Sequence, residues 1–339
     1  MLYRFLGQTG IKVGVFSYGT WLTFNKLDHQ TMVTLIELAY ENGINFFDTA
    51  EIYGEGQVEV KLGKVLRQLS FSRSRYMVST KVFWGGPHPT ECGLSRKHIY
   101  DGCHQSLKRL QVDYIDFYSC HRPDRNTPIE ETVIAMNNLI HQGKILYWGT
   151  SEWPKEAILE AYHIAKQNHL IPPSVEQFEY NMFCNEMADV LSLDRQNKIH
   201  IGTCTTMPLA CGILAGQYNN GIPNESRVKK IQSDYFNQLV QSDKGKSKIT
   251  IAKKLESIAQ DMQMTLAQLA LYWCLQNKKI NTIILGASKP YQLIENLGTL
   301  DFFSKQVVPE NVLKKMNSLL TIQDKEYDEP TYAEVALES

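Results

Sequence analysis

The strongest constraint on this chain is a repeated alternation between short apolar runs and longer segments of helical period. Eight runs rich in β-branched and aromatic residues occupy residues 13–19, 44–50, 76–82, 114–120, 145–151, 173–180, 199–205 and 281–287. Amphipathic segments such as TMVTLIELAYENG and RKHIYDGCHQSLKRL lie between them, and Gly, Asn or Pro marks their ends. Eight strand-helix units in one chain predict an α/β fold of the (β/α)8 barrel type.

The remaining segments add a cap and a tail to this barrel. Residues 2–13, LYRFLGQTGIKV, predict an N-terminal β-hairpin that turns at Gln-Thr-Gly. No linker rich in Pro or Gly divides residues 1–320, so they are predicted to be a single barrel domain. Residues 321–339 are acidic and without periodicity, which predicts a loose C-terminal tail.

A doubly wound open sheet is the alternative fold. It would carry a Gly-x-Gly-x-x-Gly fingerprint between a strand and a helix. Residues 54–59, GEGQVE, have two of the three glycines and start several residues after the strand. They are better interpreted as a loop that leads into a helix.

Charge and cysteine usage narrow the class of protein. The 35 Lys and Arg residues balance 36 Asp and Glu, so no broad field attracts nucleic acid or an anionic membrane. The 7 cysteines are scattered and never spaced as Cys-x-x-Cys, which favours neither a disulfide framework nor a zinc site. With no signal peptide and no run long enough to span a bilayer, a cytoplasmic protein is expected.

Polar residues gather where the predicted strands end. Asp48, Lys81 and His121 end three consecutive strands, and Tyr53 follows in the first loop. Each has an ordinary alternative, as a helix cap, a solvated cation, a hydrogen-bonded strand terminus or a surface aromatic. In a (β/α)8 barrel, however, these ends converge on one small volume, which favours a common site.

The four side chains together suit proton donation to a carbonyl oxygen. A nearby ammonium, Lys81, is expected to lower the pKa of Tyr53, and Asp48 is expected to keep that ammonium charged. His121 would donate a second hydrogen bond to the substrate oxygen. No side chain donates hydride, so a nicotinamide cofactor is implied.

The phosphates of such a cofactor are expected on the loops after the last two strands. Residues 286–296, GASKPYQLIEN, lead into a helix there, and Arg227 could reach an adenine or a 2′-phosphate. The same residues also fit an ordinary turn with a capped helix.

Long motifs in the chain resemble the aldo-keto reductase superfamily, and within it the potassium-channel β-subunit branch. They are NGINFFDTAEIY, STKVFWGGP, GLSRKHI, CHRPDRNTPIEETVIAM, YWGTSEW, EQFEYNMF, PLACGI and ILGAS. The resemblance covers nearly the whole chain up to about residue 320, and CHRPD with WGTSEW is closer to plant-type members.

The resemblance implies an NADP(H)-dependent reductase of aldehydes and ketones, with Asp48, Tyr53, Lys81 and His121 as the catalytic tetrad. The alternative is a regulatory β subunit of voltage-gated potassium channels that uses NADP(H) as a redox sensor. That role implies a homotetramer bound to a channel α subunit, through which the protein would associate with a membrane. Because the sequence starts at the hairpin, no inactivating N-terminal peptide is expected. The cofactor-binding residues that the resemblance implies are Thr20, Trp21, Asp48, Ser151, Glu152, Gln177, Pro208, Leu209, Ala210, Cys211, Arg227, Gly286, Ser288, Gln292, Glu295 and Asn296.

The chain departs from the family pattern at two places. Where the pattern has Thr-Trp-Ser, with a Trp that stacks on the nicotinamide, this chain has Thr205, Thr206 and Met207. Where the pattern has a Lys near the phosphates, this chain has Gln217. Both differences predict weaker cofactor binding and a weaker preference for NADP over NAD.

Overall fold

A computed structural model describes residues 1–185, 199–224, 226, 228–229, 234–305 and 308–320. The described chain forms two compact units. The first comprises residues 1–178, 199–206 and 279–293, and the second comprises the described residues of 179–185, 207–278 and 294–320. The predicted tail, residues 321–339, lies outside the described residues.

Eight strands of the first unit close into a barrel in the order β10-β3-β4-β5-β6-β7-β8-β9. They are β3 (Phe16–Gly19), β4 (Phe46–Asp48), β5 (Met77–Val82), β6 (Ile115–Cys120), β7 (Ile145–Ser151), β8 (Val175–Glu179), β9 (Gly202–Thr206) and β10 (Thr282–Leu285). The first and last of them pair in parallel, with Ile283 opposite Phe16. This confirms the predicted (β/α)8 barrel, because each strand lies within or overlaps one of the eight apolar runs.

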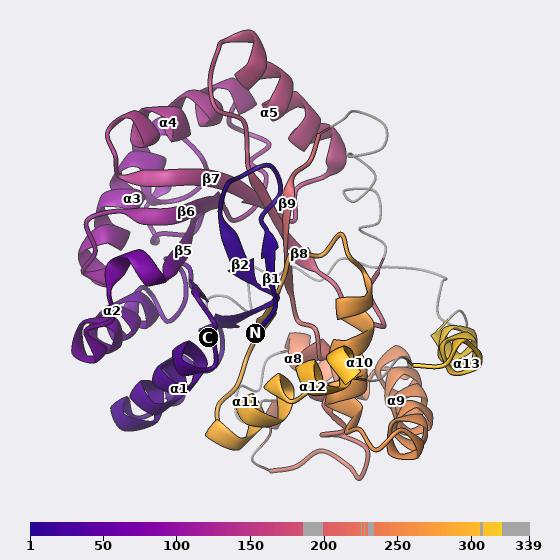
Figure 1. Cartoon of the computed structure of the whole chain (residues 1–339). Helices are drawn as coiled ribbons and strands as arrows, with labels where there is room; N and C mark the ends of the chain where they lie inside the picture. The colour runs from indigo at the N-terminus through magenta and orange to yellow at the C-terminus, as the bar shows by residue number, and fades with distance from the viewer. Residues whose placement is uncertain (186–198, 225, 227, 230–233, 306–307, 321–339) are drawn as a thin grey trace. The chain divides into compact units, whose positions relative to one another are not determined.

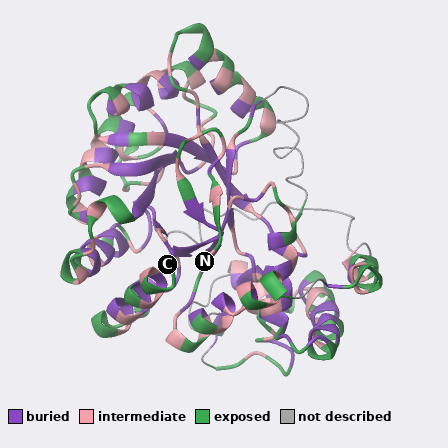
Figure 2. Ribbon diagram, in the orientation of Figure 1, coloured by how far each residue is buried: buried purple, intermediate pink, exposed green. Residues whose placement is uncertain are grey.

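Five amphipathic helices follow β3 to β7 in turn and lie outside the strands (Figure 1). They are α1 (His29–Glu41), α2 (Gln57–Leu69), α3 (Arg96–Leu110), α4 (Ile129–His141) and α5 (Lys155–Gln167), with the short 3-10 helices η1 (Phe24–Lys26), η2 (Arg73–Arg75) and η3 (Pro89–Glu91) between elements. Side-chain caps start two of them, since Asp28 accepts from the Thr31 N–H and Ser95 from the His98 N–H. Figure 2 shows buried strands and helices that are exposed on one face only.

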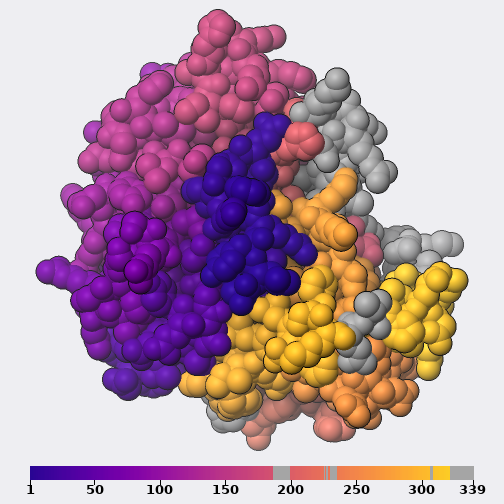
Figure 3. Space-filling view, in the orientation of Figure 1, coloured from indigo at the N-terminus to yellow at the C-terminus, as the bar shows by residue number. Residues whose placement is uncertain are grey.

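The N-terminal hairpin, β1 (Tyr3–Phe5) and β2 (Lys12–Gly14), covers the end of the barrel where the strands begin. Its residues lie at the surface in Figure 3. Inside, Leu6 and Val13 are fully buried. They pack in one cluster with six strand residues: Phe46, Met77, Phe117, Val175, Cys204 and Ile284. The hairpin therefore covers this end of the barrel and also completes its hydrophobic core.

The turn of the hairpin requires glycine at one position. Gly7 has φ +57°, and a Cβ there would collide with the backbone of Gly202. The Gln8 N–H donates to the His200 carbonyl over 3.1 Å, and the Gly7 N–H donates to Asn281 Oδ1 over 3.3 Å. Gly10, three residues on, has open space around it.

The second unit is helical in its described part. Its elements are η4 (Ala210–Ala215), α8 (Asp234–Gln241), α9 (Asp243–Asp261), α10 (Leu266–Gln276), α12 (Thr299–Lys305) and α13 (Glu310–Leu320), while α11 (Pro290–Leu297) begins in the first unit and ends in the second. A capping box of Thr265 and Gln268 starts α10, whose apolar residues are almost all buried.

No helix among the described residues combines the length and apolar character that a membrane span requires. All seven cysteines lie in described parts of the chain, and no two of them form a disulfide there.

Candidate active site

A buried ion pair forms the centre of the candidate site. Lys81, near the end of β5, donates from Nζ to Asp48 Oδ2 at the end of β4 over 2.7 Å. The ammonium is fully buried and also donates to the Thr49 carbonyl over 2.8 Å. Burial lowers the pKa of Lys81, but the charges and hydrogen bonds of Asp48 and Tyr53 outweigh it and raise the pKa above 10.5. Lys81 is therefore held as a cation.

Asp48 is held by further hydrogen bonds to its second carboxylate oxygen. Ser79 Oγ donates to Oδ1 over 2.7 Å, and Gln177 Nε2 donates to the same atom over 3.0 Å. The Asp48 carbonyl accepts from both the N–H and the hydroxyl of Thr20. A buried carboxylate with this many donors keeps one orientation.

Tyr53 lies in the loop after β4, and its hydroxyl is 3.5 Å from Lys81 Nζ. Its side chain is buried, with the ammonium 5.2 Å from the ring centroid. Lys81 acts on the Tyr53 pKa in the predicted direction, but burial has the larger effect, and the pKa is raised above 10. The expected lowering is thus reversed by desolvation, and Tyr53 stays protonated at neutral pH.

His121 follows β6 and faces Tyr53, with the ring centroids 5.9 Å apart. Burial, with the charges of Arg122 and Lys81, holds its pKa well below 6.5. The imidazole is therefore neutral, with one N–H to donate. Its Nδ1 is buried and has no hydrogen-bond partner in the protein, as expected of a group that meets a ligand.

Two neighbours of this group were not predicted from the sequence. Ser79 lies on the same face of β5 as Lys81, and the β4–β5 register places it beside Asp48. The ring of Trp84 lies 5.0 Å from that of His121, and the Arg122 guanidinium is 5.7 Å from the Trp84 ring. Two-residue spacing from Lys81 could have indicated Ser79, whereas Trp84 lies beyond the end of its strand.

The predicted cofactor residues of the first unit lie at the same ends of the strands. Trp21 lies 6.3 Å from the Tyr53 ring, and its Nε1 is buried without a protein partner. Ser151 ends β7 and pairs with Gln177, and the Glu152 N–H donates to the Gln177 carbonyl over 2.9 Å. The rings of Trp21 and His121 both lie next to the Tyr53 ring, and each has a buried nitrogen without a protein partner. These residues therefore fit a bound nicotinamide and carbonyl.

The predicted phosphate loop begins after β10. Gln292 Oε1 accepts from the N–H groups of Ser288 and Lys289 and from the Ser288 hydroxyl, at 3.1 to 3.2 Å. The side-chain oxygen of Gln292 thus accepts from donors at the start of α11 that could otherwise bind an anion. A Cβ on Gly286 would contact nothing, which leaves this backbone open.

The other predicted cofactor residues belong to the second unit. Pro208, Ala210 and Cys211 are buried and Leu209 is half-buried, at the start of η4. Met207, which replaces a residue of the family pattern, places Sδ 3.7 Å from Cys211 Sγ. On α11, Asn296 is buried and Glu295 is half-buried, and the Glu295 carbonyl accepts from Gln268. Arg227 lies outside the described residues.

Metal ligands do not gather in this chain: among the residues that the structure describes, no three His, Cys, Asp or Glu side chains form a cluster that could hold an ion.

Comparison with known protein families identifies most of the chain. The family model described as the aldo/keto reductase family matches residues 15–312. The match starts just after the hairpin and includes the entire barrel, with Asp48, Tyr53, Lys81 and His121. The chain therefore belongs to the aldo/keto reductase family, a family of oxidoreductases that generally use nicotinamide cofactors.

Proposed function

We propose that this chain reduces aldehydes or ketones to alcohols with NADP(H), with Tyr53 as the general acid. The observation that carries the proposal is the buried series Asp48–Lys81–Tyr53 beside a neutral His121. When bound, the nicotinamide supplies the hydride, and the chain's own groups control the proton.

Each group has one part in the proposed reaction. The Tyr53 hydroxyl donates its proton to the carbonyl oxygen, and the Lys81 cation stabilises the resulting phenolate. Asp48 keeps Lys81 charged and in place. His121 donates a hydrogen bond to the same oxygen, which orients the carbonyl and shares the developing negative charge.

The proposal is tested by Tyr53→Phe, which removes only the acidic hydroxyl. Loss of a general acid costs about 10²- to 10⁴-fold, so NADPH oxidation with nitrobenzaldehyde should fall to near background. Tyr147→Phe is the matched control, because it removes the same atom from an aromatic that stacks on Phe117 at the other end of the barrel interior. A Tyr53→Phe variant that turns over as fast as the parent would contradict the assignment.

Cofactor choice is proposed to be NADP(H), supported by Ser288, Gln292, Glu295 and Asn296, which match the family pattern. Thr206 and Met207 stand where that pattern has Trp and Ser, and Gln217 stands where it has Lys. Binding is therefore expected to be weaker than in relatives that retain the Trp and the Lys. Titration of the intrinsic Trp fluorescence with NADPH and with NADH measures both affinities. Equal affinities would contradict the NADP assignment and leave the proton chemistry standing.

The sequence motifs favour a second role, as a regulatory subunit of a voltage-gated potassium channel, which is compatible with the first. This role stays a prediction from the motifs, as do the cytoplasmic location and the tetramer. It predicts a tetramer on size-exclusion chromatography that the cytoplasmic assembly domain of a channel retains on a column. A monomer at micromolar concentration that is not retained would contradict it.

A further inference from the structure

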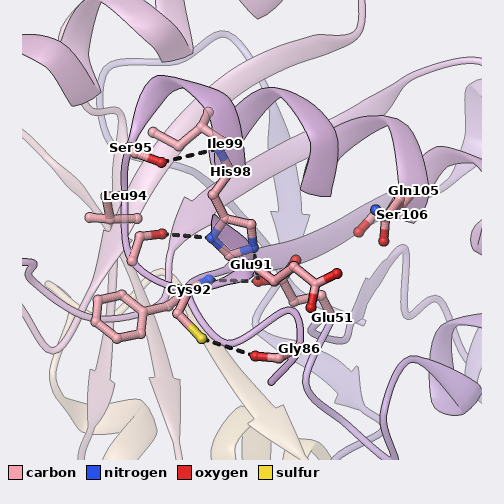
Figure 4. A network of polar contacts seen from close by, with 12 residues as sticks. Glu51, Gly86, Glu91, Cys92, Leu94, Ser95, His98, Ile99, Gln105 and Ser106 are labelled. Carbon is pink, nitrogen blue, oxygen red and sulfur yellow. Dashed lines mark hydrogen bonds and ion pairs between the residues drawn. The ribbon is translucent and has the colours of Figure 1, made fainter. Parts of the chain in front are cut away.

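Figure 4 shows a second buried pair, Glu51 and His98, which has no part in the proposed proton series. The Glu51 N–H donates to the Lys81 carbonyl over 3.2 Å, so the pair lies next to the candidate site. Glu51 precedes Tyr53 by two residues in the β4–α2 loop, and His98 lies in the first turn of α3. Both side chains are almost fully buried, and His98 Nε2 is 3.4 Å from Glu51 Oε1. A buried carboxylate and imidazole in contact call for an explanation.

The protonation of His98 follows from its partners. Its Nδ1 is 2.8 Å from the Gly93 carbonyl oxygen, which can only accept, so Nδ1 carries a proton. In a neutral ring Nε2 would then present a lone pair to the Glu51 carboxylate. A second proton, on Nε2, removes this repulsion between two acceptors, and the imidazolium and the carboxylate then form an ion pair.

The effect of the surroundings on His98 agrees with this geometry. Burial lowers the pKa of His98, but the hydrogen bond and charge of Glu51, the Gly93 carbonyl and the charge of Asp101 outweigh it and raise the pKa above 6.5. The charges that act on the pKa of His98 are those of Glu51 and Asp101, and both favour the cation. The Tyr118 hydroxyl lies near Glu51, and Glu91 and Asp124 lie along the loop. The neighbouring cation on α3, Lys97, is exposed and paired with Asp101.

The pair holds both sides of one short loop, residues 83–93. Glu51 Oε1 accepts from the Phe83 N–H over 2.7 Å, and His98 binds the Gly93 carbonyl. Phe83 and Gly93 are themselves joined, because the Gly93 N–H donates to the Phe83 carbonyl over 2.8 Å. The next residues inward, Trp84 and Cys92, form an antiparallel bridge. Glu51 and His98 therefore clamp the base of the 83–93 loop.

Two glycines make room for this clamp. A Cβ on Gly85 would lie 2.6 Å from His98 Nε2, and a Cβ on Gly102 would lie 2.9 Å from Glu51 Oε2. Side chains at either position would displace the pair. The close fit shows that the two side chains have a defined place between the loop and α3.

We propose that Glu51 and His98 are a positioning pair, in which the protonated imidazole fixes the base of the 83–93 loop and so places the Trp84 ring beside His121. Deprotonation leaves two acceptors facing each other, loosens the loop and moves Trp84 away from His121. The kinetic consequence rests on the proposed reductase function, whereas the structural consequence does not.

The direction of the pH effect follows from the raised pKa of His98. The clamp is complete below 6.5, the ordinary value of a histidine, and is lost as the pH rises through the higher value in the folded protein. We expect kcat/KM to fall about tenfold over that rise, less than the roughly 100-fold that a misplacement of about 1 Å can cost.

Two variants and a control separate this role from a merely structural one. Glu51→Gln can still accept from Phe83 and can donate to a neutral Nε2, so it keeps the contacts without the charge. His98→Gln removes the titrating group. His104→Gln is the matched control, because His104 lies on the same helix with Nδ1 2.8 Å from the Tyr100 carbonyl but is only half-buried and has no acidic partner.

The first readout is NMR of the protein without cofactor, with labelled histidine and tryptophan. The His98 ring should titrate with a midpoint above 6.5, and the Trp84 indole signal, assigned with Trp84→Phe, should move with the same midpoint. In Glu51→Gln the His98 midpoint should drop below 6.5, and in His98→Gln the Trp84 movement should disappear. A His98 midpoint at or below 6.5 in the parent, or a Trp84 signal that does not follow it, overturns the proposal.

The second readout is the pH profile of kcat/KM. The parent and His104→Gln should share the fall at high pH, and Glu51→Gln should lose it. If no variant reduces carbonyls at any pH, the proposed function fails, while the NMR titration still decides the positioning pair. A profile that is the same in Glu51→Gln and in the parent overturns the link from the pair to the reaction.

Discussion

The two ends of the barrel interior differ sharply, although the same strands supply both. At the end where the strands begin, the interior side chains are apolar and pack on Leu6 and Val13 of the hairpin. Two to four residues later the same strands present charged and polar groups: Asp48 after Phe46, Lys81 after Met77, His121 after Phe117 and Gln177 after Val175. Burial of side chains stabilises the folded state at the apolar end and destabilises it at the polar end.

The apolar end is the one that stabilises the fold. Each large apolar side chain contributes about 1.5–3 kcal/mol when it is buried. Burial of an ion costs several kcal/mol, and the attraction between Lys81 and Asp48 only offsets that cost. A buried charge that stability does not require indicates chemistry.

The largest expected effect comes from Lys81→Met, which removes the cation at the polar end. The change leaves Asp48 buried without its counter-charge, which destabilises a protein by about 3–5 kcal/mol. Carbonyl reduction should fall to near background. Urea unfolding and NADPH oxidation measure the two effects.

The double variant Asp48→Asn with Lys81→Met sharpens that result. It removes both charges and should recover most of the lost stability without recovering activity. A double variant as unstable as Lys81→Met alone would contradict the view that stability does not require the pair.

A comparable loss of stability, without a loss of chemistry, is expected for Phe117→Ala at the apolar end. Phe117 packs edge-on against Phe46 and stacks on Tyr147 at 5.2 Å. The cavity should cost about 3–5 kcal/mol in urea unfolding, while kcat of the folded protein stays near that of the parent. Phe117→Leu, which keeps most of the volume, should cost less than about 1.5 kcal/mol. A kcat that falls together with stability would show that the two ends are not separable.

The smallest effect concerns acid stability. The pKa of His121 is held well below 6.5 by burial, so the unfolded chain binds a proton in a pH range where the folded protein does not. The stability is present above pH 6.5 and is lost as the pH falls toward the folded value. Urea unfolding from pH 7.5 to 5 should therefore show a shallower decline in His121→Asn than in the parent. Parallel declines would contradict the low pKa.

Much of the barrel could be predicted from the sequence, because strand runs and helix ends are local signals. The candidate site followed from the same signals, since parallel strands bring Asp48, Lys81 and His121 to one rim. The pKa of Tyr53 could not be predicted, because it depends on how much of the molecule surrounds the hydroxyl. Ser79 and Trp84 were missed for a similar reason: their neighbours come from strand register and from a loop whose path is not periodic.

The hairpin turn at Gly7 has a consequence for how the chain is made. Its neighbours, Gly202 and Asn281, are synthesised long after it leaves the ribosome. The hairpin therefore cannot take its final place until these distant residues have been synthesised, and the apolar end of the barrel stays uncovered until β9 and β10 arrive. Until then the growing chain exposes apolar surface, which makes such an intermediate prone to aggregation, and closure of the hairpin removes that surface from water.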